Sequence, residues 1–174
     1  MNRIITLLLV LSTGAMVSLA QSSGNIEQKL TKMGVALYEL PAPTANYVRA
    51  VRSGNLIFLA GHGPMKPDGT NVTGKLGRDL SVAEGQQAAR YAAIALLSAL
   101  KEEIDLDQVQ RIVKVYGMVN CTSDFIDHSQ VVNGCSDFIA EVFGEVGKHA
   151  RAAVGMNSLP GNIAVEIEMI VEVK

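Results

Sequence analysis

The clearest structural signal in this sequence is the stretch Tyr47-Val-Arg-Ala-Val-Arg-Ser-Gly-Asn-Leu-Ile-Phe-Leu-Ala-Gly61. Residues 47–52 alternate apolar and polar side chains, which is typical of a strand with one buried face. Ser53-Gly54-Asn55 supplies turn residues, and the continuous apolar run that follows is typical of a buried strand. The stretch therefore predicts a β-hairpin whose second strand is buried.

The residues after this hairpin predict a long loop and then helices and strands. Repeated glycines and prolines interrupt residues 61–80, and long loops in compact domains are often functional. Ser81 and Glu84 have the spacing of a capping box, which predicts a helix that reaches about residue 103. The remaining apolar patterns predict a helix at 125–143 and strands at 109–119, around 154 and at 165–173.

These elements predict an α+β sandwich, with a mixed sheet of five to six strands and two helices on one face. One face of such a sheet carries no helix. Because the strands are strongly apolar, we expect other copies of the chain to cover that face.

Composition limits the function classes. The chain has 174 residues, of which 48% are hydrophobic, so it can bury one sizeable core. A formal charge of −2, 5% aromatic residues and the absence of Trp disfavour a nucleic-acid partner. No Cys/His motif predicts a metal site. Cys121 and Cys135 are expected as buried free thiols, with a disulfide as the open alternative.

The first twenty residues have the pattern of a secretory signal. Arg3 precedes an apolar stretch, and Ser18-Leu19-Ala20 fits a cleavage site. A membrane anchor is the alternative, but the apolar stretch is short for a bilayer span. We expect a signal peptide at 1–20, a linker or fraying helix at 21–34 and one domain at 35–174. The protein would then be exported, to a periplasm or outside the cell, with no membrane anchor after cleavage.

Arg151 and Glu166 are the strongest candidates for chemistry. They lie on two successive predicted strands joined by Leu159-Pro160-Gly161-Asn162, and a hairpin-like connection would place them side by side. A guanidinium matches a carboxylate with a planar fork of donors, and a glutamate can orient or deprotonate a water. The alternatives are an ion-paired arginine at a strand edge and a solvated glutamate.

Several segments together resemble the reactive-intermediate deaminase (RidA, YjgF-like) family in order and spacing. They are the stretch 47–61, Arg111-Ile-Val-Lys, Val132-Asn133, Ala150-Arg151, Leu159-Pro160 and Val165-Glu166-Ile-Glu168. The resemblance covers residues 42–174, and the loop at 61–80 resembles a longer-looped subgroup.

This resemblance implies a chorismate-mutase-like fold, assembled as a homotrimer with clefts between subunits. It implies hydrolysis of 2-imino or enamine acids to 2-keto acids and ammonia, like a 2-iminobutanoate/2-iminopropanoate deaminase, without metal or cofactor. By position, Arg151 matches the residue that binds the substrate carboxylate and Glu166 the one that orients water. Tyr47, Gly61 and Asn133 match the family's other cleft residues.

The chain departs from the family pattern at two positions. Ala60 replaces a common serine, and Ala153 replaces a common cysteine, so a covalent mechanism through that thiol is excluded. The alternative function is therefore a non-catalytic trimeric protein that binds small carboxylates in the same clefts. A ribonuclease is disfavoured by the acidic charge and the lack of a basic stripe. His62, between two glycines, is either a proton shuttle or an exposed loop residue.

Overall fold

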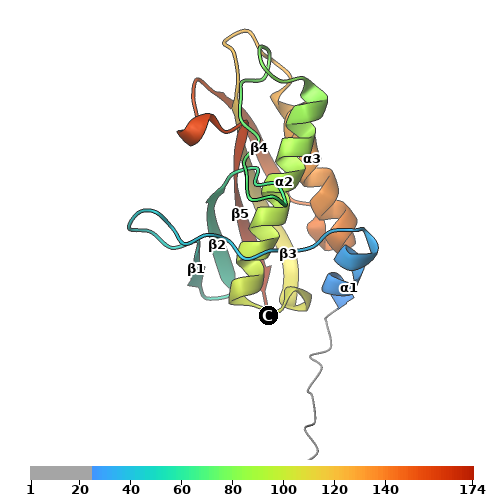
Figure 1. The fold of residues 1–174 in the computed structure, drawn as a ribbon. Coiled ribbons are helices and arrows are strands. Elements are labelled where there is room, and N and C mark those ends of the chain that lie inside the picture. The colour runs from blue at the N-terminus through green and yellow to red at the C-terminus, as the bar shows by residue number, and fades with distance from the viewer. Residues whose placement is uncertain (1–24) are drawn as a thin grey trace, which may run out of the picture.

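A computed structural model of the chain describes residues 25–174, which form one mixed sheet with helices on one face (Figure 1). The helices are α1 (Asn25–Lys32), α2 (Val82–Glu103) and α3 (His128–Phe143). The strands are β1 (Ala50–Ser53), β2 (Leu56–His62), β3 (Val109–Asn120), β4 (Ala150–Met156) and β5 (Val165–Val173). The predicted signal segment, residues 1–20, lies outside the described residues. Within residues 25–174, no helix is both long enough and apolar enough to cross a membrane.

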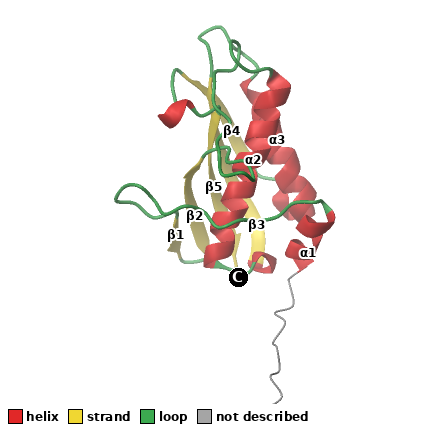
Figure 2. Cartoon of the chain, in the orientation of Figure 1, coloured by secondary structure: helices red, strands yellow, loops and turns green. Residues whose placement is uncertain are grey.

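The α+β prediction is confirmed, with five strands in the order β1-β2-β5-β3-β4. Strands β3 and β4 pair in parallel, whereas the other neighbours are antiparallel. Figure 2 shows α2 and α3 side by side over one face of the sheet. The opposite face carries none of the described helices.

The predicted hairpin is confirmed as β1 and β2, paired from Ala50 with Leu59 to Ser53 with Leu56. Gly54 begins the turn with φ +61°, a conformation that glycine adopts readily. Leu59 is 4% exposed and Phe58 is 42% exposed, because successive side chains of a strand point to opposite faces. The hairpin thus covers the core with one face and presents apolar side chains on the other.

The two long helices pack closely because small residues line their contact. Ser81 and Glu84 form the predicted capping box at the start of α2. Gly134 on α3 lies against α2, and a Cβ there would be 1.9 Å from the carbonyl oxygen of Gln86. This contact sets how closely α2 and α3 approach each other.

Helix α1 changes the expected domain start. The segment 21–34 was predicted as a linker or fraying helix, but α1 begins at Asn25 and packs on the domain. The side chain of Asp107 accepts hydrogen bonds from the backbone N–H groups of Asn25 and Ile26, at 2.7 and 2.9 Å. Leu30 is 2% exposed. The packed structure therefore begins before residue 35.

The helix-free face of the sheet contains an apolar hollow of about 330 Å³. Its lining includes Val48, Val51 and Phe58, which are 61%, 54% and 42% exposed. Tyr116 and Ile170, on the central strands β3 and β5, also line it, and Lys114 and Glu168 add charged groups. Such exposure of neighbouring apolar side chains is typical of a protein interface.

Candidate functional site

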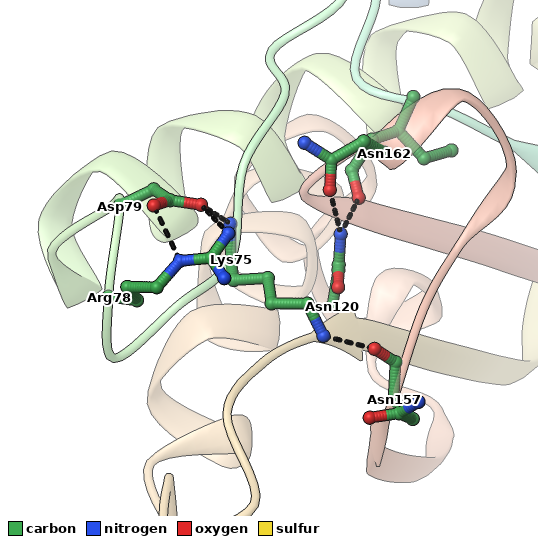
Figure 3. Close-up of polar contacts among 7 residues, drawn as sticks. Lys75, Arg78, Asp79, Asn120, Asn157 and Asn162 are labelled. Carbon is green, nitrogen blue, oxygen red and sulfur yellow. Dashed lines mark hydrogen bonds and ion pairs between the residues drawn. The ribbon is translucent and has the colours of Figure 1, made fainter.

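The connection between β4 and β5 is not the hairpin that the sequence indicated. Strand β3 lies between the two strands, so the connection passes over the end of β3. Asn120, the last residue of β3, donates from its side-chain amide to Asn162 Oδ1 and to the carbonyl oxygen of Ile163, both at 3.0 Å (Figure 3). The prediction that Arg151 and Glu166 lie side by side is therefore wrong within one chain.

The same close-up shows how the long loop is attached to this connection. Lys75 donates its ammonium to the carbonyl oxygen of Asn157 (Figure 3). Asp79 accepts from the backbone N–H of Lys75 at 2.9 Å and pairs with Arg78 at 2.8 Å. Arg78 holds the pKa of Asp79 at about 2, mainly through hydrogen bonding. These contacts fix one end of residues 61–80 against the β4–β5 connection.

Arg151 and Glu166 also point to opposite faces of the sheet. Arg151 reaches α3, which lies on the helix-covered face. Val165 and Ile167 are fully buried, so Glu166 between them points to the helix-free face. Arg151 pairs with Val115 of β3 and Glu166 pairs with Met118. The two residues are therefore about 10 Å apart across the sheet and about 10 Å apart along it.

Arg151 is held by two side chains of α3. Its Nη1 donates to Asn133 Oδ1 at 2.8 Å and to Ser136 Oγ at 3.1 Å. The structure thus brings together two predicted site residues, Arg151 and Asn133. Both hydrogen bonds among the described residues leave from Nη1, so Nε and Nη2 are left for a ligand. A guanidinium fixed in this way is suited to a bidentate carboxylate.

Ser136 and His149 belong to this group of side chains, and the sequence reasoning missed both. Ser136 Oγ lies 3.0 Å from His149 Nε2, and His149 Nδ1 lies 2.7 Å from the carbonyl oxygen of Gly147. Burial, and then the charge of Arg151, lower the pKa of His149. Spacing would have revealed both residues, because Ser136 is one helical turn after Asn133 and His149 is two residues before Arg151.

Glu166 is positioned by the absence of a side chain at Gly61. A Cβ at Gly61 would be 2.1 Å from Glu166 Oε1, so a larger residue would displace the carboxylate from this position. Burial, and then the charge of Glu168, raise the pKa of Glu166. The carboxylate is thus a stronger base than an exposed glutamate would be.

Tyr47 lies near this second group. It is 53% exposed and lines a hollow of about 420 Å³ together with Gly61 and His62. His62 is 8% exposed, which makes the prediction of an exposed loop histidine wrong. Its Nδ1 lies 2.7 Å from the carbonyl oxygen of Ala60, and burial lowers its pKa. The structure therefore places Gly61 against Glu166 and Tyr47 in a hollow beside Gly61, and Arg151 and Asn133 line neither.

The two cysteines are buried free thiols, as expected. Burial raises the pKa of Cys135 to about 12, so this thiol is not a nucleophile at neutral pH. Ala153, at the position of the family's cysteine, packs against the core. Within residues 25–174, no group of three or more His, Cys, Asp or Glu side chains is placed to hold a metal ion.

The sequence matches the model of the family described as "YjgF/chorismate mutase-like, putative endoribonuclease" over residues 27–173. Protein TCP17 of Trypanosoma cruzi is 43% identical over 153 residues, which are 87% of this chain and 96% of that protein. A RutC family protein of Pyrococcus abyssi is 31% identical over 131 residues, covering 75% and 88%.

Two solved structures share the fold closely. The protein Atu1372 of Agrobacterium tumefaciens, whose function is described as unknown, has a TM-score of 0.79 and 44% identity. The match covers 86% of this chain and 93% of that one. A Shewanella oneidensis protein named "putative endoribonuclease" has a TM-score of 0.82 and 28% identity, with 86% and 100% covered.

Proposed function

The chain belongs to the YjgF/chorismate mutase-like family, and on that basis we propose that it hydrolyses 2-imino or enamine acids to 2-keto acids and ammonia. The proposal rests mainly on the environments of two side chains, Arg151 and Glu166. Arg151 has donors directed for a carboxylate, and Glu166 has the raised pKa that a general base requires. A 2-imino acid presents both a carboxylate and an electrophilic C=N carbon.

The reaction needs only these groups and water. With the substrate carboxylate on Arg151, Glu166 removes a proton from a water as its oxygen attacks the C=N carbon. The carboxyl group then returns that proton to the nitrogen. The same carboxylate next moves the proton of the carbinol hydroxyl to the nitrogen. Ammonia then leaves as the C–N bond breaks, and the carbinol oxygen forms the carbonyl of the keto acid. No electron is gained or lost, so the reaction requires no redox cofactor.

We propose that each cleft is completed by a second copy of the chain, in a homotrimer. Arg151 and Glu166 point to opposite faces of one sheet, so one chain does not bring them to the same substrate. The helix-free face offers the exposed apolar side chains that contact between copies requires. Light scattering on the purified protein tests this point, because a monomer would contradict it.

RNA cleavage, suggested by the names of some relatives, has less support. The chain carries 15 basic and 17 acidic side chains. Binding to RNA depends mainly on neutralised phosphates, which an acidic chain does not favour. The non-catalytic binder shares the Arg151 group with the deaminase and differs from it only in turnover.

The test is release of ammonia and keto acid from imino acids that an amino-acid oxidase generates in the assay. We expect the protein to hydrolyse the imine faster than buffer does. Arg151→Ala should lower this rate about 100-fold or more, and Arg151→Lys should retain part of the activity. Arg111→Ala is the matched control, because Arg111 is an exposed arginine on β3. A folded protein that binds keto acids without turnover would replace the deaminase with the binder.

Export is proposed from residues 1–20 alone. Amino-acid oxidation outside the cytoplasm would then supply the imine. N-terminal sequencing of the protein from cell fractions tests the proposal. A chain that begins at Gln21 would support export, and an intact terminus in the cytoplasm would contradict it.

A further inference from the structure

The side chains beside Arg151 form a chain of hydrogen bonds that ends at a backbone carbonyl. Arg151 Nη1 donates to Ser136 Oγ at 3.1 Å, and Ser136 Oγ lies 3.0 Å from His149 Nε2. His149 Nδ1 lies 2.7 Å from the carbonyl oxygen of Gly147. Neither Ser136 nor His149 is among the residues that the family resemblance assigned to the cleft.

The direction of each hydrogen bond follows from what each atom is able to donate. A carbonyl oxygen only accepts, so His149 Nδ1 carries a hydrogen and donates to Gly147. In the neutral imidazole, Nε2 is then bare and accepts the hydroxyl hydrogen of Ser136. Ser136 has one hydrogen, which in this state it donates to His149 and not to a ligand.

Protonation of His149 reverses this arrangement. With a hydrogen on Nε2, the imidazolium donates to Ser136 Oγ, which already accepts from Arg151. The hydroxyl hydrogen of Ser136 is then released and turns toward the hollow beside Arg151. That hollow, about 260 Å³, is lined by Ser136, His149 and Arg151 among others. A carboxylate oxygen there would accept from Ser136 as well as from Arg151.

We propose that a carboxylate bound at Arg151 draws a proton onto His149 through the hydroxyl of Ser136, which turns from the histidine to the ligand. Ser136 is thus a further carboxylate contact, and His149 is a positioning residue that acts through it. This inference rests on the proposed function, because it takes the carboxylate of the same substrate as the ligand. It adds that substrate binding and proton uptake are linked.

The charges around His149 also favour its protonation when a carboxylate binds. Within residues 25–174, the elements packed around His149 carry these charged groups: Arg151 on β4, Asp137 and Glu141 on α3, Glu145 and Lys148 between α3 and β4, and Arg111 and Lys114 on β3. Lys148 and Glu145 pair at 2.7 Å in solvent, and Lys114 lines the hollow on the other face of the sheet. The charge of Arg151 is the one that lowers the pKa of His149, after burial. A bound carboxylate offsets that charge and therefore raises the pKa.

The test is calorimetric titration of the protein with pyruvate, a 2-keto acid, in two buffers of different ionisation enthalpy between about pH 5.5 and pH 8.5. The difference between buffers gives the number of protons taken up. We expect uptake of up to about one proton per site, falling to none at the alkaline end. Uptake should vanish in His149→Gln and in Ser136→Ala, and persist in His128→Gln, a histidine at the start of α3.

A measurement on the unaltered protein tests the inference even if the variants fail to fold. The NMR titration of His149 Cε1–H should show a higher pKa with pyruvate than without it. Binding of pyruvate without proton uptake, or with an unchanged His149 titration, overturns the inference and leaves the carboxylate site intact. Absence of both pyruvate binding and imine turnover overturns the inference together with the proposed function.

Discussion

The Arg151 end and the Glu166 end of the candidate site are positioned by different means. Arg151 is directed by hydrogen bonds from Nη1 to Asn133 and Ser136. Glu166 is positioned by burial and by the space that Gly61 leaves. The proposed carboxylate-binding end therefore depends on the direction of polar groups, and the proposed water-activating end depends on exclusion of solvent. The two ends lie on opposite faces of one sheet, so a single chain does not bring them together.

The largest effect is expected when the two defects, one at Arg151 and one at Glu166, are placed in different copies of the chain. Arg151→Ala and Glu166→Gln should each lose about 100-fold or more of the activity. If a cleft takes its arginine from one copy and its glutamate from another, a co-refolded equal mixture should recover roughly a quarter of wild-type activity. Half of the copies carry each intact residue, so some clefts hold both.

The control for mixing is each variant refolded with itself. A mixture as inactive as its components would mean that both residues act from the same copy. The arrangement in which opposite faces of the sheet serve one substrate would then be wrong, although the catalytic roles proposed for the two residues would remain.

Gly61→Ala should have the next largest effect, about 10- to 100-fold on kcat. The new methyl group overlaps the position of Glu166 Oε1, so the carboxylate must move away from its water. Binding of pyruvate at Arg151 should change little, because that end is held from α3. Ala60→Ser is the matched control, since it enlarges the preceding residue and adds the hydroxyl common in the family. Equal activity of Gly61→Ala and wild type would contradict the packing argument.

Much of the fold follows from local pattern. The apolar run at 56–60, the capping box at Ser81 and Glu84 and the alternation at 165–173 each specify an element that the structure contains. These signals are local, because burial of one face imposes its period on the sequence. Helix α1 was less evident, since its first N–H groups are capped by the distant Asp107.

The arrangement of the site was harder to predict than its residues. Arg151 and Glu166 lie on strands joined by a short connection, which is the pattern of a hairpin. Their separation depends on β3 entering between them, and β3 precedes both in the sequence. No local signal specifies that order. The contacts that stabilise it, such as Asn120 with Asn162, join residues 42 positions apart.

Asn133→Ala should have a smaller effect, at the Arg151 end of the site. Removal of one of the two acceptors leaves Arg151 bonded to Ser136, so we expect KM to rise about 3- to 10-fold with little change in kcat. Steady-state kinetics over a range of imine concentrations separates the two constants. Asn55→Ala is the control. Asn55 lies in the turn after β1 and donates a hydrogen bond to Glu172 on β5, so this variant also loses one side-chain amide contact. A loss mainly in kcat would place Asn133 at the reacting atoms instead.

The smallest expected effect is on the stability of the fold. Its dependence on pH reports the burial of the Glu166 end. The folded protein raises the pKa of Glu166 above its ordinary 4.5, so ionisation opposes folding. The free energy of unfolding should therefore fall as pH rises from below 4.5 through the folded pKa. Glu166→Gln removes this cost and should raise Tm by about 1–3 °C at neutral pH.

Below pH 4.5 the gain from Glu166→Gln should disappear, because Glu166 is then protonated in both the folded and the unfolded chain. Glu168→Gln should give a smaller gain, since Glu168 raises the pKa of Glu166 less than burial does. Thermal unfolding across this pH range measures both variants. A Tm that falls in Glu166→Gln at neutral pH would mean that the ionised carboxylate stabilises the fold. Burial would then not explain how the water-activating end is prepared.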